Sequence, residues 1–208
     1  MKHNLLLISS MALVLLTACN ANQSDGVSVL NQGQAIGSTE EATKPEVPEG
    51  AIVDESGDFV YTGLLQPIGD DENGYIQVPL GYVPFQDEDV EGLTQYSDVS
   101  GTNIFTLDYY EGIPYESAAE NMRYYLSQQE NIEGLSGAIV PVAGYNSRQL
   151  YCHFKDDNMF MVVWLIEDPD NTENCYYLAI EFDSAHQEIM ACSSTFQTVN
   201  DYHKTNKE

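Results

Sequence analysis

The chain has 208 residues, of which 43% are hydrophobic, so it can bury the core of one domain and still carry extra segments. Its 33 acidic and 7 basic residues give a net charge of −26 at pH 7. A field of this sign repels phosphate backbones and anionic lipid headgroups, which argues against nucleic acid as a partner. We expect that the excess of acidic residues keeps the protein soluble. The alternative is that it serves to bind a cationic partner or calcium.

The N-terminus has the pattern of an export signal. Lys2 and His3 precede an apolar run, Leu5–Leu16, which is too short to span a bilayer as a helix of ~20 residues. The run ends in Leu16-Thr17-Ala18-Cys19. This tetrapeptide resembles the lipobox of bacterial lipoproteins, whose cysteine is lipidated on sulfur and becomes the mature N-terminus. The alternative is an incidental cysteine after an ordinary signal. We expect lipidation of Cys19, with two acyl chains sufficient for stable anchoring.

The stretch after Cys19 is rich in Asn, Gln, Ser, Gly, Glu and Pro. Such a composition buries too little apolar surface to offset chain entropy. The expected organisation is therefore a signal peptide over 1–18, the lipidated Cys19 with a flexible acidic linker over 19–58, an α+β domain over 59–199 and a polar tail over 200–208.

The run Met159–Ile166 predicts an interior β-strand with both faces covered, because apolar side chains occupy every position. Arg148–Phe154 and Cys175–Phe182 are expected to flank it in an antiparallel meander. Earlier strands are predicted over Phe59–Leu65, Tyr75–Pro79, Leu80–Phe85, Leu93–Ser97 and Asn103–Tyr110, with a turn over Asp70–Gly74 and a short, irregular strand over Ala138–Ala143.

Ser117 and Glu120 form a capping-box pattern before an apolar stripe at helical spacing, which predicts a helix over Ala118–Glu130. On the surface of this helix, Arg123 is expected to form ion pairs with Glu116 and Glu120.

A second pattern of this kind, Ser184 with Gln187, predicts a closing helix over Ala185–Thr198. Two-sided burial of the central strand requires a cover on each face. The predicted fold class is therefore α+β, an antiparallel sheet sandwiched by helices.

The order of these motifs resembles PsbP-like domains, a family that includes many small lipoproteins of Gram-positive bacteria. The resemblance rests on Ile76–Tyr82, Gln95–Asp98, Thr102–Ile104, the capped helix with the meander, and Ser194–Phe196. It covers 59–199, and Tyr82 stands where the family pattern Val-Pro-x-Gly-Trp has tryptophan. The resemblance implies a PsbP-like fold and no catalytic residue, since these domains serve as assembly factors, extrinsic subunits or binding modules.

Three cysteines remain in the expected domain, and the meander places Cys152 and Cys175 on the strands either side of the central one. At ~9–10 Å apart they are beyond the ~7 Å reach of a disulfide. Cys192 could bridge either one only by facing it across the core, so we expect three buried thiols. Cys152 and His153 point to opposite faces, which excludes them as a nucleophile and base.

No two histidines have the spacing of a zinc site; His186 lies in the predicted closing helix and His203 in the tail. Asp168–Glu173 lacks the glycine and the final glutamate of an EF-hand loop. Asp87–Glu91 is a charge run typical of a solvated loop. We therefore expect no metal and no cofactor, with weak calcium binding by the acidic loops left open.

Tyrosine doublets occur at Tyr109-Tyr110, Tyr124-Tyr125 and Tyr176-Tyr177. They predict rings that fill the margins of a half-buried sheet, or else an exposed aromatic strip for glycan or peptide contact.

The sequence favours a non-catalytic binding or accessory module held by its lipid at the outer face of the bacterial cytoplasmic membrane. Its partners would be the membrane and an envelope protein, peptide or glycan. The alternatives are an envelope enzyme, which a pair of carboxylates with shifted pKa would favour, and an assembly factor for a membrane complex.

Overall fold

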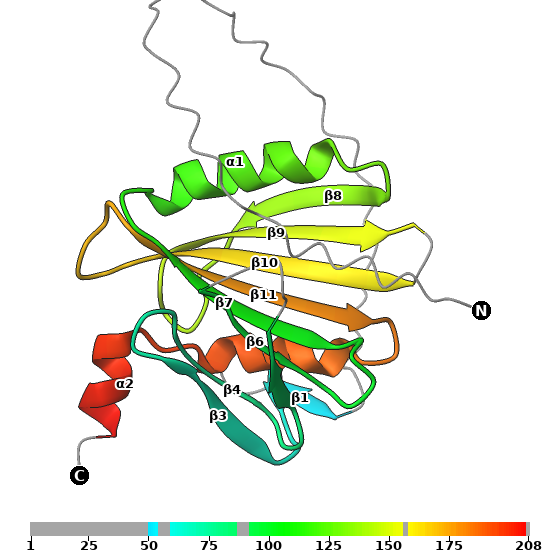
Figure 1. Ribbon diagram of the computed structural model, residues 1–208, viewed down its shortest axis with the longest axis horizontal. Coiled ribbons are helices and arrows are strands. Elements are labelled where there is room, and N and C mark those ends of the chain that lie inside the picture. Colours follow the sequence, from blue (N-terminus) through cyan, green and yellow to red (C-terminus); the bar gives the residue numbers. More distant parts are fainter. Residues whose placement is uncertain (1–49, 54–58, 87–91, 156–157, 207–208) are drawn as a thin grey trace, which may run out of the picture. The chain divides into compact units, whose positions relative to one another are not determined.

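The structure is a computed structural model that describes residues 50–53, 59–86, 92–155 and 158–206, so Cys19 and the loop Asp87–Glu91 lie outside the described residues. Its main element is a seven-stranded sheet in the order β5-β6-β7-β11-β10-β9-β8, and all neighbouring strands are antiparallel (Figure 1). These strands are β5 (Val83–Phe85), β6 (Thr94–Ser97), β7 (Ile104–Tyr110), β8 (Ile132–Ile139), β9 (Ser147–Phe154), β10 (Met159–Glu167) and β11 (Cys175–Asp183).

Two small sheets and three helical segments make up the rest of the secondary structure in the described residues. One small sheet pairs β1 (Ala51–Val53) with β2 (Phe59–Tyr61), and the other pairs β3 (Leu65–Asp70) with β4 (Gly74–Pro79). The helical segments are α1 (Tyr115–Ser127), the 3-10 helix η1 (Gln187–Thr195) and α2 (Val199–Thr205). In the described ranges no helix has both the length and the apolar character needed to cross a bilayer.

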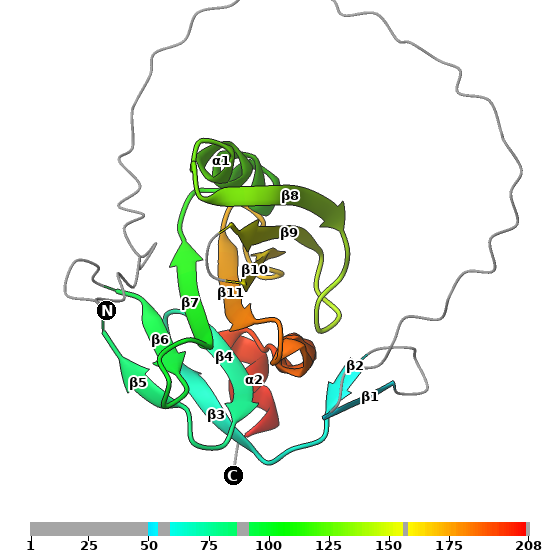
Figure 2. The same ribbon diagram turned by 90° about the vertical axis from the view of Figure 1, so that its right-hand side faces the viewer.

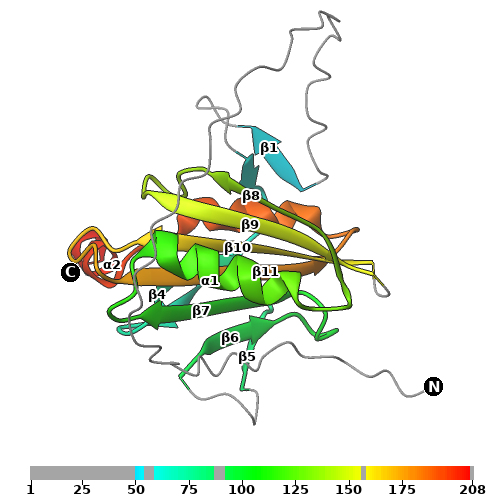
Figure 3. The same ribbon diagram turned by 90° about the horizontal axis from the view of Figure 1, so that it is seen from above.

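The sheet has a different cover on each face. Seen along the strands, α1 lies on one side, and β4 and α2 lie on the other (Figure 2). Seen from above, α1 runs along the sheet with β8 at the margin (Figure 3). We call the side covered by α1 the α1 face. The opposite side, covered by β4 and by η1, which contacts β4 and β11, is the η1 face. The α+β class and the antiparallel sheet expected from the sequence are confirmed.

The strand β10 is interior, as its composition predicts. All residues of Met161–Ile166 are buried. Val162, Trp164 and Ile166 belong to the main apolar cluster on the η1 face, together with residues of β4, β7, β11 and η1. Val163 and Leu165 alternate with them, so they face α1. The predicted meander of β9, β10 and β11 is also confirmed.

The first helix begins earlier than the capping box predicts. α1 starts at Tyr115 with Pro114 at its N-cap, and it ends at Ser127 rather than Glu130. Ser117 is thus inside the helix and caps nothing. Proline is tolerated at this entry because the residues that begin a helix need no N–H for an intrahelical hydrogen bond. The predicted apolar stripe is confirmed: its buried members are Ala118, Ala119, Met122 and Leu126.

The expected closing helix is a shorter 3-10 segment. Ser184 does not cap it, because the segment begins at Gln187 with His186 at the N-cap. The Ser184 hydroxyl instead accepts from Asn158 Nδ2, and Gln187 Nε2 donates to the Ser184 carbonyl oxygen at 3.2 Å. The segment still buries Ile189 and Cys192 against the sheet, as the spacing predicts.

Several boundaries also differ from the sequence prediction. The expected strand Phe59–Leu65 is divided between β2 and β3. The strand expected over Ala138–Ala143 begins earlier, because β8 starts at Ile132 and ends at Ile139. β1 falls within the range expected to be linker, and α2 begins at Val199 and extends through most of the expected polar tail. The predicted turn over Asp70–Gly74 is confirmed as the turn of the β3–β4 hairpin.

α2 is held by tertiary contacts. The Tyr202 ring stacks on Tyr75 of β4 with centroids 3.6 Å apart, and His203 Nε2 lies 2.6 Å from Asp71 Oδ1. Thr198 caps the helix by accepting from Asp201 N at 3.3 Å. These contacts explain why a polar segment that sequence periodicity does not mark is ordered as a helix.

Candidate binding groove

A groove of about 270 Å³ lies between α1, β8 and β9. The helix contributes Glu116, Glu120 and Arg123, the strand β8 contributes 137–139, and β9 contributes 148–150. Positions 116, 120 and 123 are three and four residues apart, which places their side chains on one side of the helix. The helix therefore forms a charged wall beside the outermost strand of the sheet.

Gly137 keeps the floor of the groove open. A Cβ at this position would lie 3.1 Å from Leu150 Cδ2 and 3.9 Å from Arg123 Nη1. A contact of 3.1 Å is tighter than side chains normally make, so a larger residue would push into the floor or into the guanidinium group. The missing side chain lets the Arg123 guanidinium lie close to the backbone of β8.

Both arginines of the chain line this groove. Arg148 is half-buried on β9 and Arg123 is exposed on α1. The four ion pairs among the described residues all lie elsewhere, and neither guanidinium makes a hydrogen bond with a described residue. The expected pairing of Arg123 with Glu116 or Glu120 is thus wrong. Two planar, fixed positive charges therefore lie beside one cavity, and neither has an ionic partner in the part of the chain that the structure describes.

No motif in the sequence marks this groove as a site. Arg123 and Arg148 are 25 positions apart (148 minus 123), and only the packing of α1 over β9 brings them together. The one signal in the sequence is that arginine is rare, since just two of the seven basic residues are arginines.

The cysteines are placed as expected. Cys152, Cys175 and Cys192 are buried, free thiols. Burial raises the pKa of each thiol to about 12, so the reactive thiolate is not populated at neutral pH. His153 is half-buried on the opposite face of β9 from Cys152 and lies with its Nδ1 3.0 Å from Glu133 Oε1. Cys152 and His153 thus lie on opposite faces of the sheet, as the strand pattern predicts.

The tyrosine doublets on strands fill both faces of the sheet. Tyr109 packs on the buried Tyr176 with centroids 4.7 Å apart, and Tyr110 packs on Tyr177 at 5.9 Å. Tyr109, Tyr110 and Tyr177 are half-buried. These rings therefore support the sheet, and they form no exposed strip. Tyr124, on α1, is 70% exposed.

Two carboxyl groups on the α1 face have raised pKa values. Burial raises the pKa of Glu181 on β11 to about 7 and that of Asp108 on β7 to about 6, the latter opposed by a hydrogen bond from Tyr109 N. Asp108 pairs with Tyr177, which is four residues from Glu181, so the two strand positions are ~13 Å apart. Burial raises each pKa, and neither carboxyl group contributes to the pKa shift of the other, so the two groups are not electrostatically coupled.

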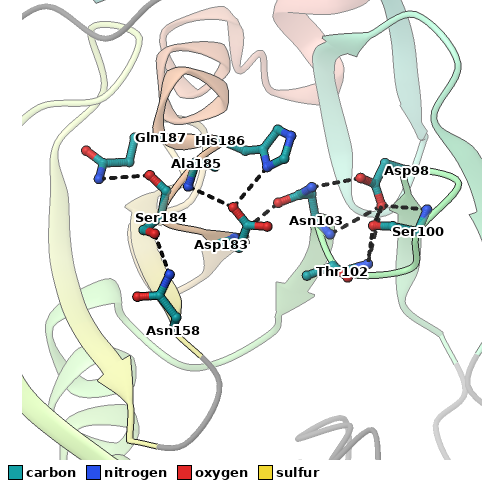
Figure 4. Close-up of polar contacts among 10 residues, drawn as sticks. All are labelled: Asp98, Ser100, Thr102, Asn103, Asn158, Asp183, Ser184, Ala185, His186 and Gln187. Atoms are coloured by element: carbon teal, nitrogen blue, oxygen red, sulfur yellow. Dashed lines mark hydrogen bonds and ion pairs between the residues drawn. The ribbon is translucent and has the colours of Figure 1, made fainter. Parts of the chain in front are cut away.

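A polar network joins the β6–β7 turn to the start of η1 (Figure 4). Asn103, which is buried, donates through Nδ2 to Asp98 Oδ2 at 2.7 Å and accepts through Oδ1 from Asp183 N at 3.2 Å. Asp183 Oδ1 also accepts from Ala185 N at 2.7 Å and lies 3.0 Å from His186 Nδ1. The contact with Asp183 raises the pKa of His186. The donors and acceptors of this network satisfy one another, so its role is to fix the corner.

Asp98 anchors the turn at the other end of this network. Burial alone would raise its pKa, but hydrogen bonds from Ser100 and Asn103 outweigh that effect and lower it.

The loop compared with calcium sites is closed by its own contacts. The buried Asp168 accepts from Asp170 N at 2.9 Å and from Tyr109 Oη at 2.6 Å, and Asp170 Oδ2 accepts from Asn200 Nδ2 at 2.7 Å. Within the described part of the chain, no group of three His, Cys, Asp or Glu residues is arranged to hold a metal ion.

Comparisons with known proteins bear on the fold alone. The chain is similar to the solution structure of cyanobacterial PsbP (CyanoP) from Synechocystis sp. PCC 6803, with 12% identity, a TM-score of 0.49, and coverage of 64% of this chain and 92% of that one. It is also similar to the Ran-binding protein MOG1P of Saccharomyces cerevisiae, with 12% identity, a TM-score of 0.43, and coverage of 66% and 96%. No protein-family model and no curated protein matches the sequence. Neither structural similarity supports an argument about a ligand or a reaction.

Proposed function

We propose that this chain is a lipid-anchored, PsbP-like binding module at the outer face of the bacterial cytoplasmic membrane, and that its groove captures a ligand through a carboxylate group. The anchoring part of the proposal is supported by Leu16-Thr17-Ala18-Cys19 after the apolar run. The binding part is supported by the groove between α1 and β8.

The observation that carries the proposal is the convergence of both arginines on one cavity. In a protein of net charge −26, attraction for an anion must be produced locally. Arg123 and Arg148 supply it, because a guanidinium group binds a carboxylate through two parallel hydrogen bonds. Glu116 and Glu120 on the same wall disfavour a highly charged polyanion and favour a ligand with a single carboxylate.

Titration of the full-length chain with propionate tests the binding part. In amide NMR spectra of the protein in detergent micelles, we expect the largest shifts at Gly137 and Gln149. Arg148→Gln should weaken binding at least about tenfold, since a charge-assisted hydrogen bond contributes ~1.5–3 kcal/mol. Lys204→Gln is the control, because it makes the same change in net charge outside the groove. Equal weakening in both variants would contradict the proposal.

Mass spectrometry of the native protein tests the anchoring part. We expect a diacylglycerol thioether on an N-terminal Cys19 and recovery of the protein in the membrane fraction. The Cys19→Ser variant should be recovered in the soluble fraction. An unmodified amino terminus on the wild-type protein would refute the anchor and leave the groove to be judged separately.

An exposed apolar cluster favours assembly as a second candidate function. Leu64 is 76% exposed and Leu80 is 61% exposed, and they are neighbours because Leu80 N donates to the Leu64 carbonyl oxygen at 2.8 Å. Adjacent exposed leucines are typical of protein contact surfaces. If this cluster holds a membrane complex together, the double variant Leu64→Ser, Leu80→Ser should lose the co-purifying subunits that the wild type and Arg148→Gln retain. Unchanged recovery would remove this candidate.

A further inference from the structure

The outermost strand β8 offers a free edge beside the two arginines. Among the described strands it pairs with β9 alone. Its residues 136–139 are exposed, and Ile139 is 71% exposed. A free strand edge presents unpaired backbone groups to which another extended chain can bond.

The hydrogen-bond alternation shows which backbone groups are free. Glu167 N donates to the Asn146 carbonyl oxygen and Lys155 N donates to that of Asn131, both at 2.9 Å. Even-numbered residues of β9 therefore bond to β10 and odd-numbered ones to β8. Ser136 and Ala138 stand opposite the odd residues Tyr151 and Gln149, so their backbone groups face β9.

It follows that the backbone N–H and C=O groups of Gly137 and Ile139 point away from the sheet. Their side-chain positions lie on the α1 face, because they stand opposite Leu150 and Arg148. The free backbone groups and the arginine-lined groove thus meet along the same residues of β8.

The regular part of this edge is short. A bulge interrupts the pairing between Glu133 and Ser136, with Gly134 at φ +62°, and Pro141, just past the strand, has no N–H to donate. The usable template is therefore 136–140. A template of this length suits the end of a peptide better than an internal strand of a longer chain, which would continue past both ends of the template.

From these features we propose that the groove binds the C-terminal end of an extended peptide from another protein. The peptide adds to β8 as a strand, bonds to the free backbone groups of Gly137 and Ile139, and places its terminal carboxylate on Arg123 and Arg148. The inference rests on the proposed function, and it names the ligand class. A second copy of this chain is a poorer occupant, since two molecules of charge −26 repel one another.

The charge requirement is tested with a random pentapeptide pool made in two forms. In one form the C-terminus of every peptide is a free carboxylate, and in the other it is a carboxamide. The immobilised full-length protein in detergent micelles is incubated with each pool, and retained peptides are measured by mass spectrometry. We expect about tenfold greater retention of the free-carboxylate pool, and loss of this preference in Arg148→Gln but not in Lys204→Gln. Equal retention of the two pools would overturn the proposal.

The strand requirement is tested by a matched pair at one position. Ile139→Pro removes the outward N–H, whereas Ile139→Ala keeps it, and neither disturbs a bond to β9. We expect retention of the free-carboxylate pool to fall at least about fivefold in the proline variant relative to the alanine variant. Circular dichroism melting of both variants controls for folding, and propionate titration of Ile139→Pro shows whether the arginines still bind an anion.

The outcomes separate the two proposals. If propionate shifts the groove amides but Ile139→Pro and Ile139→Ala retain peptides equally, the anion site stands and strand addition is refuted. If neither propionate nor the free-carboxylate pool responds to Arg148→Gln, the proposed function itself fails.

Discussion

The two edges of the large sheet are built in opposite ways. β5 is three residues long with Pro84 at its centre, whereas β8 is eight residues long and contains no proline. Asp98 N donates to the Asn103 carbonyl oxygen at 3.1 Å, so the even residues of β6 bond to β7 and the odd residues bond to β5. Pro84 stands opposite the even residue Tyr96 and therefore presents its nitrogen outward, where no N–H is available.

This contrast identifies β8 as the edge that can accept another strand. Short length and an outward proline are common means of preventing strand addition, and β5 has both. β8 has a bulge at one end but remains exposed over 136–139, and it borders the groove that contains both arginines. A free edge is a liability unless a partner uses it, so the contrast favours β8 as the functional edge.

The largest expected effect is on stability and concerns α1, the helix that forms one wall of the groove beside β8. Leu126 is 1% exposed and packs beneath the helix. Leu126→Ala should lower the free energy of unfolding by about 2–5 kcal/mol, through lost burial and a cavity. Urea denaturation measures this change. Tyr124→Ala, at a position that is 70% exposed on the same helix, should change it by less than about 0.5 kcal/mol. Similar values for the two variants would show that α1 is only loosely attached.

The middle of the sheet could be predicted from sequence because its pattern has one physical solution. Met161–Ile166 is apolar at every position, which only two-sided burial can satisfy, and the register of β9, β10 and β11 follows from short connections. The exclusion of a Cys152–Cys175 disulfide followed from the same geometry.

The helix ends could not be predicted, because several local signals compete there. Ser117 and Ser184 both fit a capping box, yet Pro114 starts the first helix and Asn158 occupies the Ser184 hydroxyl. α2 has no buried residue, and its order depends on the stacking of Tyr202 on Tyr75, a contact between distant parts of the chain. Such contacts leave no periodic pattern in the sequence.

The groove was beyond sequence reasoning for a related reason. Its arginines come from two elements whose relative placement depends on the packing of α1 over β9. The freedom of the Gly137 and Ile139 backbone depends on which strand is outermost and on the alternation of its bonds. A sequence pattern that marks β8 as a strand contains neither fact.

The pH dependence of stability depends on the middle of the sheet, where Glu181 titrates. The arginines beside β8 keep their charge over the same pH range. The pKa of Glu181 is raised to about 7 in the folded protein, above an unfolded value of ~4.3. The folded state therefore holds this proton more tightly, so the stabilising contribution is complete below pH ~4.3 and is lost as the pH rises through 7. Glu181→Gln should be more stable than the wild type by about 1–3 kcal/mol at pH 8, and the difference should vanish near pH 4.5.

Urea denaturation from pH 4.5 to 8 measures this difference. Asp108 adds a smaller change of the same sign, because its pKa is raised to about 6. The carboxyl groups of Asp98 and Asp183 have lowered pKa values, so their titration lies below this window. A constant gap between Glu181→Gln and the wild type across the range would show that Glu181 is charged at all of these pH values.

The smallest expected effect comes from making the edge strand β5 able to pair with another strand. Pro84→Thr restores an outward N–H on β5 and leaves the bonds between β5 and β6 in place, so the edge can accept a strand. Its template is only three residues long, it lacks a neighbouring arginine in the described structure, and the charge of −26 opposes association. We therefore expect a weak, salt-promoted self-association, seen by sedimentation velocity as a small rise in average mass at 0.5 M salt, roughly where screening shortens the Debye length to ~4 Å. Free-carboxylate peptides should bind this variant as they bind the wild type. If Pro84→Thr instead gained peptide binding equal to that of β8, strand addition would need no arginine, and the contrast between the two edges would reduce to the position of one proline.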